Sequence, residues 1–95
     1  MVTHVVLFKL KDRSPDNALR VRDLLREMKG RIPPLLDLEA GVDYVRSTVS
    51  YDVALITRHA DRAALDAYQV HPIHERVKLH LREVCDLAVA TDFDC

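Results

Sequence analysis

The segment Thr3-His4-Val5-Val6-Leu7-Phe8-Lys9-Leu10 is the strongest indication of the fold, because it predicts a β-strand that is apolar on both faces. Successive side chains of a strand point to opposite sides of its sheet. Even and odd positions of this segment therefore face opposite directions, and both sets are largely apolar. A strand with this pattern belongs in a sheet that is covered on both sides. The apolar sets are Val5 and Leu7 on one face, and Val6, Phe8 and Leu10 on the other.

A helix is predicted directly after this strand. Ser14 is its expected N-cap, and Pro15 suits its first position because proline lacks the backbone N–H that is unpaired there. Apolar residues then recur at helical spacing as far as Ile32, and the pair Pro33-Pro34 ends the helix. The apolar stripe consists of Ala18, Val21, Leu25, Met28 and Ile32.

Further strands are predicted in the middle of the chain and at its end. One covers residues 35–44, where Gly41 favours a bulge or a bend. Another covers residues 51–57, and the last covers residues 85–93. Like the first strand, these last two are apolar on both faces. In residues 51–57 the faces consist of Val53 and Leu55 on one side, and Ala54 and Ile56 on the other.

The stretch Tyr68-Gln69-Val70-His71-Pro72-Ile73-His74 breaks the second helical region in two. Pro72 is tolerated in the first turn of a helix, and the residue before a proline is disfavoured in the α conformation. A short helix capped by Asp61 is therefore expected to end near Val70, and a second helix to begin at Pro72. His74 then lies just inside that second helix.

The predicted order is β-α-β-β-α-β, the ferredoxin-like arrangement of the α+β class, with its second helix broken in two. This fold is an antiparallel four-stranded sheet with helices on one face. The helices leave the other apolar face without cover, which indicates a partner surface. We expect a homodimer in which two copies pack through their sheet faces. Leu55 and Leu87 are candidates for the face that meets the partner.

Length, charge and cysteine content limit the class of protein. The 95 residues are expected to form a single domain, 1–95. A net charge of −1, with both signs scattered along the chain, argues against nucleic acid as a partner. No apolar run reaches the ~20 residues that span a bilayer, and the N-terminus lacks signal-peptide features, so no membrane partner is expected. Cys85 and Cys95 form no disulfide framework, which favours a cytoplasmic location.

Several segments that come in a characteristic order along the chain resemble those of a known family. They are His4-Val5-Val6-Leu7-Phe8-Lys9-Leu10-Lys11, Tyr51-Asp52-Val53-Ala54-Leu55, Ala64-Leu65-Asp66-Ala67-Tyr68, His71-Pro72-Ile73-His74 and the closing Thr91-Asp92-Phe93. Together they resemble the stress-responsive α/β-barrel family, the dimeric α+β barrel called Dabb. The resemblance covers essentially the whole chain and implies a homodimer whose two sheets close into a barrel. It implies no particular reaction, because most members have none assigned and a fold does not dictate function.

One branch of this family resembles plant polyketide cyclases, which close a linear poly-β-keto thioester by aldol condensation without metal or cofactor. In that branch the second histidine of a His-Pro-x-His motif is the base, and an upstream tyrosine and a first-strand histidine complete the pocket. The matching residues in this chain are His74, Tyr68 and His4. A related group with the same fold performs cofactor-free oxygenation of polyketides. The resemblance therefore implies candidate catalytic residues and no cofactor.

Each candidate also has a structural interpretation. His74 lies at the edge of the apolar stripe of its helix, where it either faces a cavity as a general base or hydrogen-bonds at the helix start. Tyr68 and His4 lie on apolar faces, so each is alternatively a core residue with an internal hydrogen bond. His71 is the expected N-cap of the last helix, and His59 is expected in a solvated turn.

Three classes of function stay open. The chain is a small-molecule-binding barrel without catalysis, a cofactor-free enzyme acting on a small apolar carbonyl compound, or a subunit that acts through protein contacts. An open pocket lined by His4, Tyr68 and His74 favours the enzyme. No cysteine or carboxylate stands at a recognised ligand spacing from the histidines, so no metal site is expected.

Overall fold

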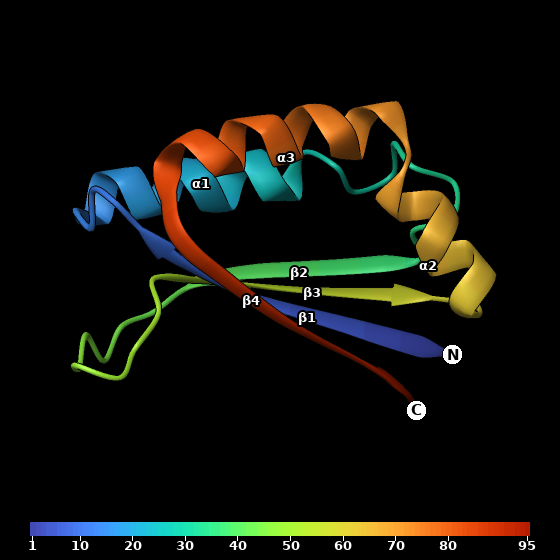
Figure 1. Cartoon of the computed structure of the whole chain (residues 1–95), viewed down its shortest axis with the longest axis horizontal. Helices are drawn as coiled ribbons and strands as arrows, with labels where there is room; N and C mark the ends of the chain where they lie inside the picture. The colour runs from blue at the N-terminus through green and yellow to red at the C-terminus, as the bar shows by residue number, and fades with distance from the viewer.

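A four-stranded antiparallel sheet forms one layer of the molecule, and helices cover one of its sides (Figure 1). The computed structural model describes residues 1–95. The elements are β1 (Val2–Leu10), α1 (Pro15–Arg26), β2 (Asp37–Val42), β3 (Val53–His59), α2 (Arg62–Gln69), α3 (Pro72–Val84) and β4 (Cys85–Asp94). The strands lie in the order β2-β3-β1-β4, which confirms the predicted ferredoxin-like arrangement. None of the helices has the length and apolar character needed to cross a membrane.

Each helix begins at a side chain that caps its first turn, as predicted. The Ser14 hydroxyl accepts a hydrogen bond from the N–H of Asn17 at 3.3 Å, and Asp61 caps α2 in the same way. His71 caps α3, because its Nδ1 accepts a hydrogen bond from the N–H of Ile73 at 3.2 Å. These side chains pair with backbone donors that have no partner inside the helix. The break between α2 and α3 is therefore fixed by local chemistry.

α1 is shorter than the apolar spacing predicted, because the chain leaves the helix after Arg26. Residues 27–34 form turns and a bend instead, and Gly30 has a left-handed φ of 79°. Glycine adopts this conformation at little cost, which allows the chain to turn here. Met28 and Ile32 still reach the core and are each 1% exposed. The spacing therefore predicted burial correctly and overestimated the length of the helix.

The strands also differ from the prediction in detail. Gly41 lies in a regular ladder opposite Ala54, so the predicted bulge at this glycine is wrong. The irregular pairing lies instead between Lys9 and Leu10, where β1 shifts register against β4. β3 continues past its predicted end as far as His59. This extension matters for the site, because it keeps His59 in the alternating pattern of buried side chains.

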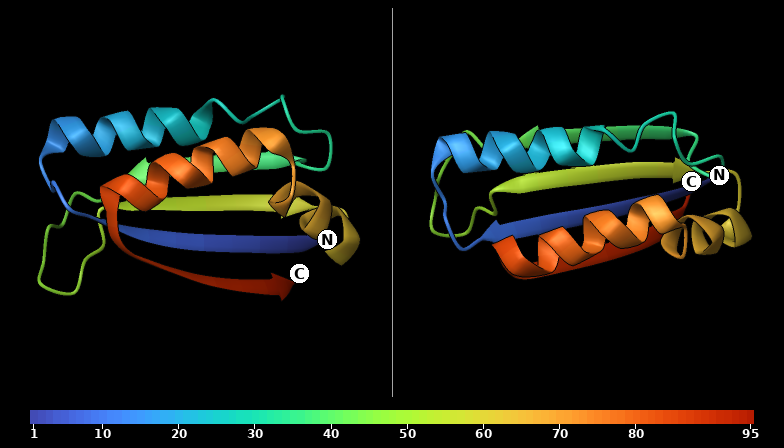
Figure 2. Two further views of the ribbon diagram at one scale, coloured as in Figure 1. Left: turned by 45° about the horizontal axis from the view of Figure 1, so that its top comes forward. Right: turned by 90° about the horizontal axis from the view of Figure 1, so that it is seen from above.

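The two faces of the sheet have different surroundings (Figure 2). The face beneath α1 and α3 carries the core, in which Leu55 is 3% exposed. The expectation that Leu55 meets a partner is therefore wrong, because it packs inside its own chain. Leu87 pairs with Lys9 on the opposite, open face and is 48% exposed. The apolar residues of this open face are Val5, Leu7, Ala54, Ile56, Leu87 and Val89.

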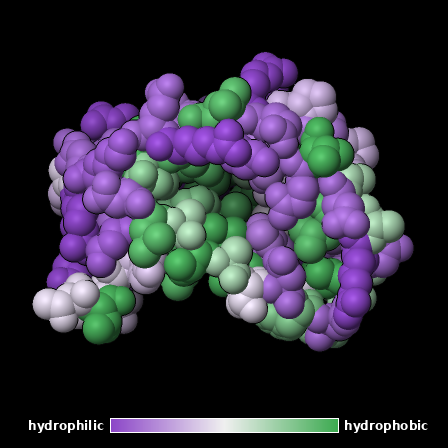
Figure 3. Space-filling model, viewed as in Figure 1, coloured by the Kyte–Doolittle hydropathy of each residue, from purple (hydrophilic) through white to green (hydrophobic).

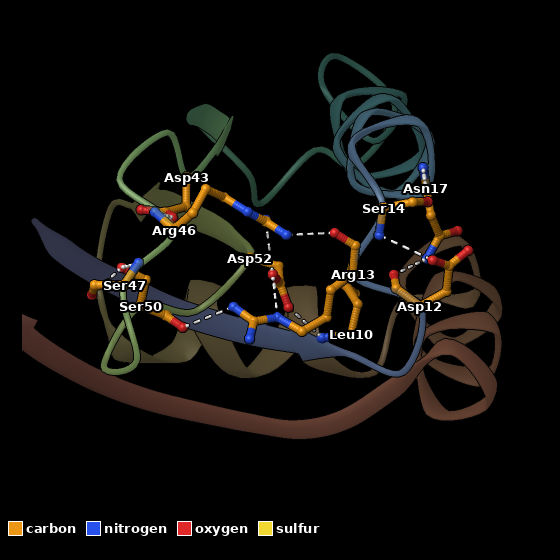
Figure 4. A network of polar contacts seen from close by, with 10 residues as sticks. All are labelled: Leu10, Asp12, Arg13, Ser14, Asn17, Asp43, Arg46, Ser47, Ser50 and Asp52. Carbon is orange, nitrogen blue, oxygen red and sulfur yellow. Dashed lines mark hydrogen bonds and ion pairs between the residues drawn. The ribbon is translucent and has the colours of Figure 1, made fainter.

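A polar network joins the connection after β1 to the loop between β2 and β3 (Figure 4). The buried carboxylate of Asp52 accepts hydrogen bonds from the Leu10 N–H at 2.8 Å, from Arg13 Nε at 2.9 Å and from Arg46 Nη1 at 3.1 Å. Burial alone would raise the pKa of Asp52, but these donors outweigh it and lower that pKa below its usual value. The network therefore fixes both connections at the end of the sheet that lies away from the chain termini (Figure 1).

Candidate functional site

His4, Tyr68 and His74 come from three different elements and meet near the end of the sheet that α2 covers. His4 faces the helices from β1, Tyr68 lies in the last turn of α2, and His74 lies in the first turn of α3. The ring centroids of Tyr68 and His74 are 4.5 Å apart, because the break at Pro72 folds α3 back beside the end of α2. The rings of His4 and Tyr68 meet edge to face, with centroids 6.3 Å apart.

A cavity of about 500 Å³ lies between α3 and the strands β1 and β4. This volume lies within the usual range of small-molecule sites. His4 and His74 form part of its wall, whereas Tyr68 packs behind them and does not line it. Figure 3 shows a recess on this side of the molecule, with hydrophobic side chains around it and a hydrophilic border above. The apolar part of the cavity wall includes Val6, Phe8, Leu55, Val77, Leu81 and Ala90.

His74 uses one ring nitrogen within the protein and leaves the other free. Its Nδ1 lies 2.9 Å from the carbonyl oxygen of Gln69. A carbonyl oxygen only accepts hydrogen bonds, so Nδ1 carries the proton and Nε2 keeps its lone pair. Burial lowers the pKa of this imidazole, and the Gln69 carbonyl opposes the shift only in part. The ring is therefore neutral at pH 7. One side chain thus makes a structural hydrogen bond at the helix start and still presents a basic nitrogen.

Tyr68 is fully buried, and its hydroxyl makes no hydrogen bond within the protein. Its ring packs between His74 on one side and His59 on the other, where the ring centroids are 4.8 Å apart. Burial raises the pKa of the phenol well above its usual value, so the hydroxyl keeps its proton. A buried hydroxyl without a partner is unusual in a folded protein. Tyr68 therefore lacks the internal hydrogen bond that is usual for a core tyrosine.

Asp92 is a member of this cluster whose role the sequence reasoning missed. It lies directly opposite His4 in the pairing of β1 with β4, and its Oδ1 accepts a hydrogen bond from His4 Nδ1. The carboxylate fixes the tautomer of His4, so His4 Nε2 is the nitrogen that remains free. The alternation of side chains along β4 could have predicted this position, because it places Asp92 on the same face as Ala88 and Ala90. A carboxylate that follows these alanines on the face beneath the helices requires a polar partner.

His59 belongs to the same cluster, and its predicted place in a solvated turn is wrong. The ring is 0% exposed. Its Nδ1 donates to the carbonyl oxygen of Pro34 at 2.9 Å, and its Nε2 accepts from the hydroxyl of Thr57 at 2.9 Å. Burial lowers the pKa of His59, so the imidazole that packs against Tyr68 is neutral. His59 is buried because β3 is longer than predicted, which keeps alternate residues directed into the core.

The cluster combines a neutral base, a protonated hydroxyl and a histidine–carboxylate pair beside an apolar cavity. His74 can accept a proton through Nε2, and Tyr68 can donate a hydrogen bond to an oxygen atom. Such a set suits the removal of a proton from a carbon next to a carbonyl group. Groups of three or more His, Cys, Asp or Glu side chains that could hold a metal ion do not occur in the structure.

Known proteins resemble this chain in sequence and in structure. An uncharacterized protein of Streptomyces coelicolor, SCO4036, is 30% identical over 93 residues, which cover 95% of this chain and 96% of that protein. A dimeric ferredoxin-like protein of unknown function from Thermobifida fusca has a TM-score of 0.85 and 26% identity, over 99% of this chain and 90% of its own. A hydroxynitrile lyase from Passiflora edulis has a TM-score of 0.80 and 13% identity, over 97% and 90% of the two chains. At that identity the likeness shows the fold alone.

A family match covers nearly the whole sequence. The Stress responsive A/B Barrel Domain matches residues 2–95. The antiparallel sheet with helices on one side and the ferredoxin-like neighbours agree with this match. The resemblance inferred from the His-Pro-x-His segment and the apolar strands is therefore confirmed. The chain belongs to the stress responsive A/B barrel domain family.

Proposed function

We propose that this chain binds a small apolar carbonyl compound in the cavity beside His4 and His74, and that it moves a proton on that compound. The proposal rests on the tautomer of His74. Because Nδ1 donates to the Gln69 carbonyl, Nε2 keeps its lone pair, and His74 lines an apolar cavity. A neutral imidazole is a general base suited to pH 7. Side chains of this protein perform each proton transfer and hydrogen bond of the proposed step.

The proposed step acts on a β-dicarbonyl group whose central carbon lies against His74. Nε2 takes a proton from this carbon, which leaves an enolate and an imidazolium. Where the compound has another carbonyl further along, the enolate carbon attacks it and forms a carbon–carbon bond. The new alkoxide then takes the proton back from His74. This aldol-type ring closure is balanced by the substrate alone, without an oxidant or a leaving group.

Tyr68 and His4 have supporting roles in this proposal. Tyr68 lies behind the cavity wall, so in this proposal ligand binding moves that wall and lets the unpaired Tyr68 hydroxyl donate to the enolate oxygen, where negative charge develops. A hydrogen bond to the ligand would also satisfy a hydroxyl that the fold leaves without a partner. His4, held in one tautomer by Asp92, completes the polar end of the cavity. Catalytic roles for His74, Tyr68 and His4 form one combined proposal.

Ligand binding without turnover is a second candidate function. The observation that favours it is the position of Tyr68, which packs behind His74 and does not line the cavity. A ligand would then occupy the cavity without its oxygen reaching the hydroxyl. The two candidates share the cavity and differ only in whether proton transfer takes place there.

We propose further that the protein is a homodimer joined through the open faces of its sheets. No helix covers Leu87 or Val89, which are 48% and 39% exposed on that face. Apolar surface of this kind is stabilised when a second copy covers it. The Thermobifida fusca protein is described as dimeric, which supports a dimer here.

The test of proton transfer follows deuterium incorporation at the central carbon of a β-diketone in D₂O, by proton NMR. We expect the wild-type protein to accelerate exchange above the buffer rate, and His74→Ala to lower the protein-dependent rate by about 10²–10⁴-fold. His80→Ala is the matched control, since His80 is an exposed histidine of α3 outside the cavity wall. If the diketone binds and exchange stays at the buffer rate, binding without turnover is the correct function.

A further inference from the structure

The cavity has a second polar end, formed by α3. His74, Lys78 and Arg82 all line it, and their spacing of four residues places them along one side of the helix. At a rise of 1.5 Å per residue, Arg82 lies about 12 Å along the helix from His74. The distance from His4 to Phe8 along β1 is similar, about 13 Å at the rise of a strand. The cavity is therefore lined along about 12 Å of α3, from an imidazole to a guanidinium.

The wall between the two ends is apolar. On α3 it is formed by Val77 and Leu81, and on the sheet by Val6, Phe8 and Ala90. An apolar chain can replace water along this part of the cavity and gain free energy from its burial. Polar groups of a ligand are therefore favoured only at the ends. The carbonyl group of the proposed function lies at the histidine end.

The part of the cavity beyond the histidines carries an excess of positive charge. Arg82 lines the far end and Lys78 lies midway along α3, against a single acidic lining residue, Asp86. Lys78 is held by Glu75, whose carboxylate lies 3.2 Å from its Nζ. Arg82 takes part in none of the ion pairs of the fold. Its guanidinium is therefore free to bind a ligand, and its planar fork matches a carboxylate through paired hydrogen bonds.

We propose that Arg82 binds a carboxylate at the far end of the ligand and thereby determines its specificity, with Lys78 adding attraction. The ligand class is an apolar chain with a β-dicarbonyl group at the histidine end and a carboxylate about 12 Å away. This inference rests on the proposed function, because it concerns the same cavity. It adds the chemical identity of the end of the ligand that takes no part in the reaction.

The experiment compares two probes that differ only in charge. One is a β-diketone joined through about six methylene groups to a carboxylate, a length chosen to span the 12 Å helix distance. The other is its methyl ester. Titration calorimetry at low salt gives both affinities. We expect the acid to bind about tenfold more tightly than the ester, as one charge-assisted hydrogen-bonded pair would provide, and this preference to shrink as salt is added.

Arg82→Gln should remove the preference for the acid and leave the affinity for the ester unchanged. Arg76→Gln is the matched control, because Arg76 is an exposed arginine of the same helix that lies outside this cavity. Equal affinities of the two probes for the wild type, loss of both affinities in Arg82→Gln, or no binding of either probe would overturn the proposal. Deuterium exchange on the ester tests proton transfer separately. If deuterium exchange occurs but the acid binds no more tightly than the ester, only the proposed carboxylate site is refuted. If the acid binds more tightly but no exchange occurs, only the proposed proton transfer is refuted.

Discussion

Replacing Tyr68 with phenylalanine separates a catalytic role of its hydroxyl from a role in the core. The hydroxyl is fully buried and has no hydrogen-bond partner. An unpaired buried polar group costs roughly 1–3 kcal/mol of folding free energy. Phenylalanine keeps the ring contacts with His59 and His74 and removes this cost. We therefore expect Tyr68→Phe to raise the free energy of unfolding by about 1 kcal/mol, near the low end of that range.

The same substitution should lower proton transfer. Loss of one hydrogen bond to the enolate oxygen, about 1.4 kcal/mol, corresponds to a tenfold lower rate of deuterium exchange. A gain of about 1 kcal/mol corresponds to a melting temperature roughly 4–8 °C higher for a domain of this size. Both proteins must be melted at one concentration, because the melting temperature of a dimer depends on concentration.

The opposite pattern would refute this reasoning. If Tyr68→Phe lowers the melting temperature, the hydroxyl has a partner in the folded protein and Tyr68 is a core residue with a structural hydrogen bond. If the variant is more stable and exchange is unchanged, the hydroxyl is unpaired but does not contact the reacting oxygen. Tyr68→Leu serves as the control for ring packing, because it removes both the hydroxyl and the aromatic contacts.

Three other predictions concern assembly, capping and pH. Leu87→Lys should dissociate the dimer in sedimentation experiments while circular dichroism stays unchanged, because Leu87 lies on the open face. Leu55→Lys should instead unfold the chain, since it buries a charge in the core. If the Leu87→Lys protein stays dimeric, another surface joins the two copies. His71→Ala should lower the free energy of unfolding by about 1 kcal/mol in urea titrations, the usual cost of losing a helix cap, without changing the ligand affinity. Burial lowers the pKa of His59 and His74 in the folded chain, so the unfolded chain binds more protons. Stability should be full above the ordinary histidine pKa of about 6.5 and fall as the pH drops below it, less steeply in His59→Gln; a flat profile would contradict this assignment.

One contact in the candidate site could be expected from the sequence, and two members of the cluster could not. The histidine–proline segment predicted the break between α2 and α3, and that break places His74 beside Tyr68. Asp92 and His59 were missed as members of the cluster. Asp92 meets His4 only through the pairing of β1 with β4, strands that lie 88 residues apart at this contact. The register of such a pairing depends on packing across the whole sheet.

The helices and strands of this protein, and the apolar character of both sheet faces, could be predicted from local sequence patterns. These features follow from local chemistry: the caps at Ser14, Asp61 and His71, the backbone limits of proline, and the alternation of side chains along a strand. Which face of the sheet the helices cover depends on the tertiary packing, which leaves Leu55 inside and Leu87 outside. It also leaves a cavity open between α3 and β4, with His74 in its wall and one imidazole nitrogen of that residue unpaired. Volumes and free hydrogen-bonding atoms depend on how distant elements pack, and local sequence patterns contain no information about that packing.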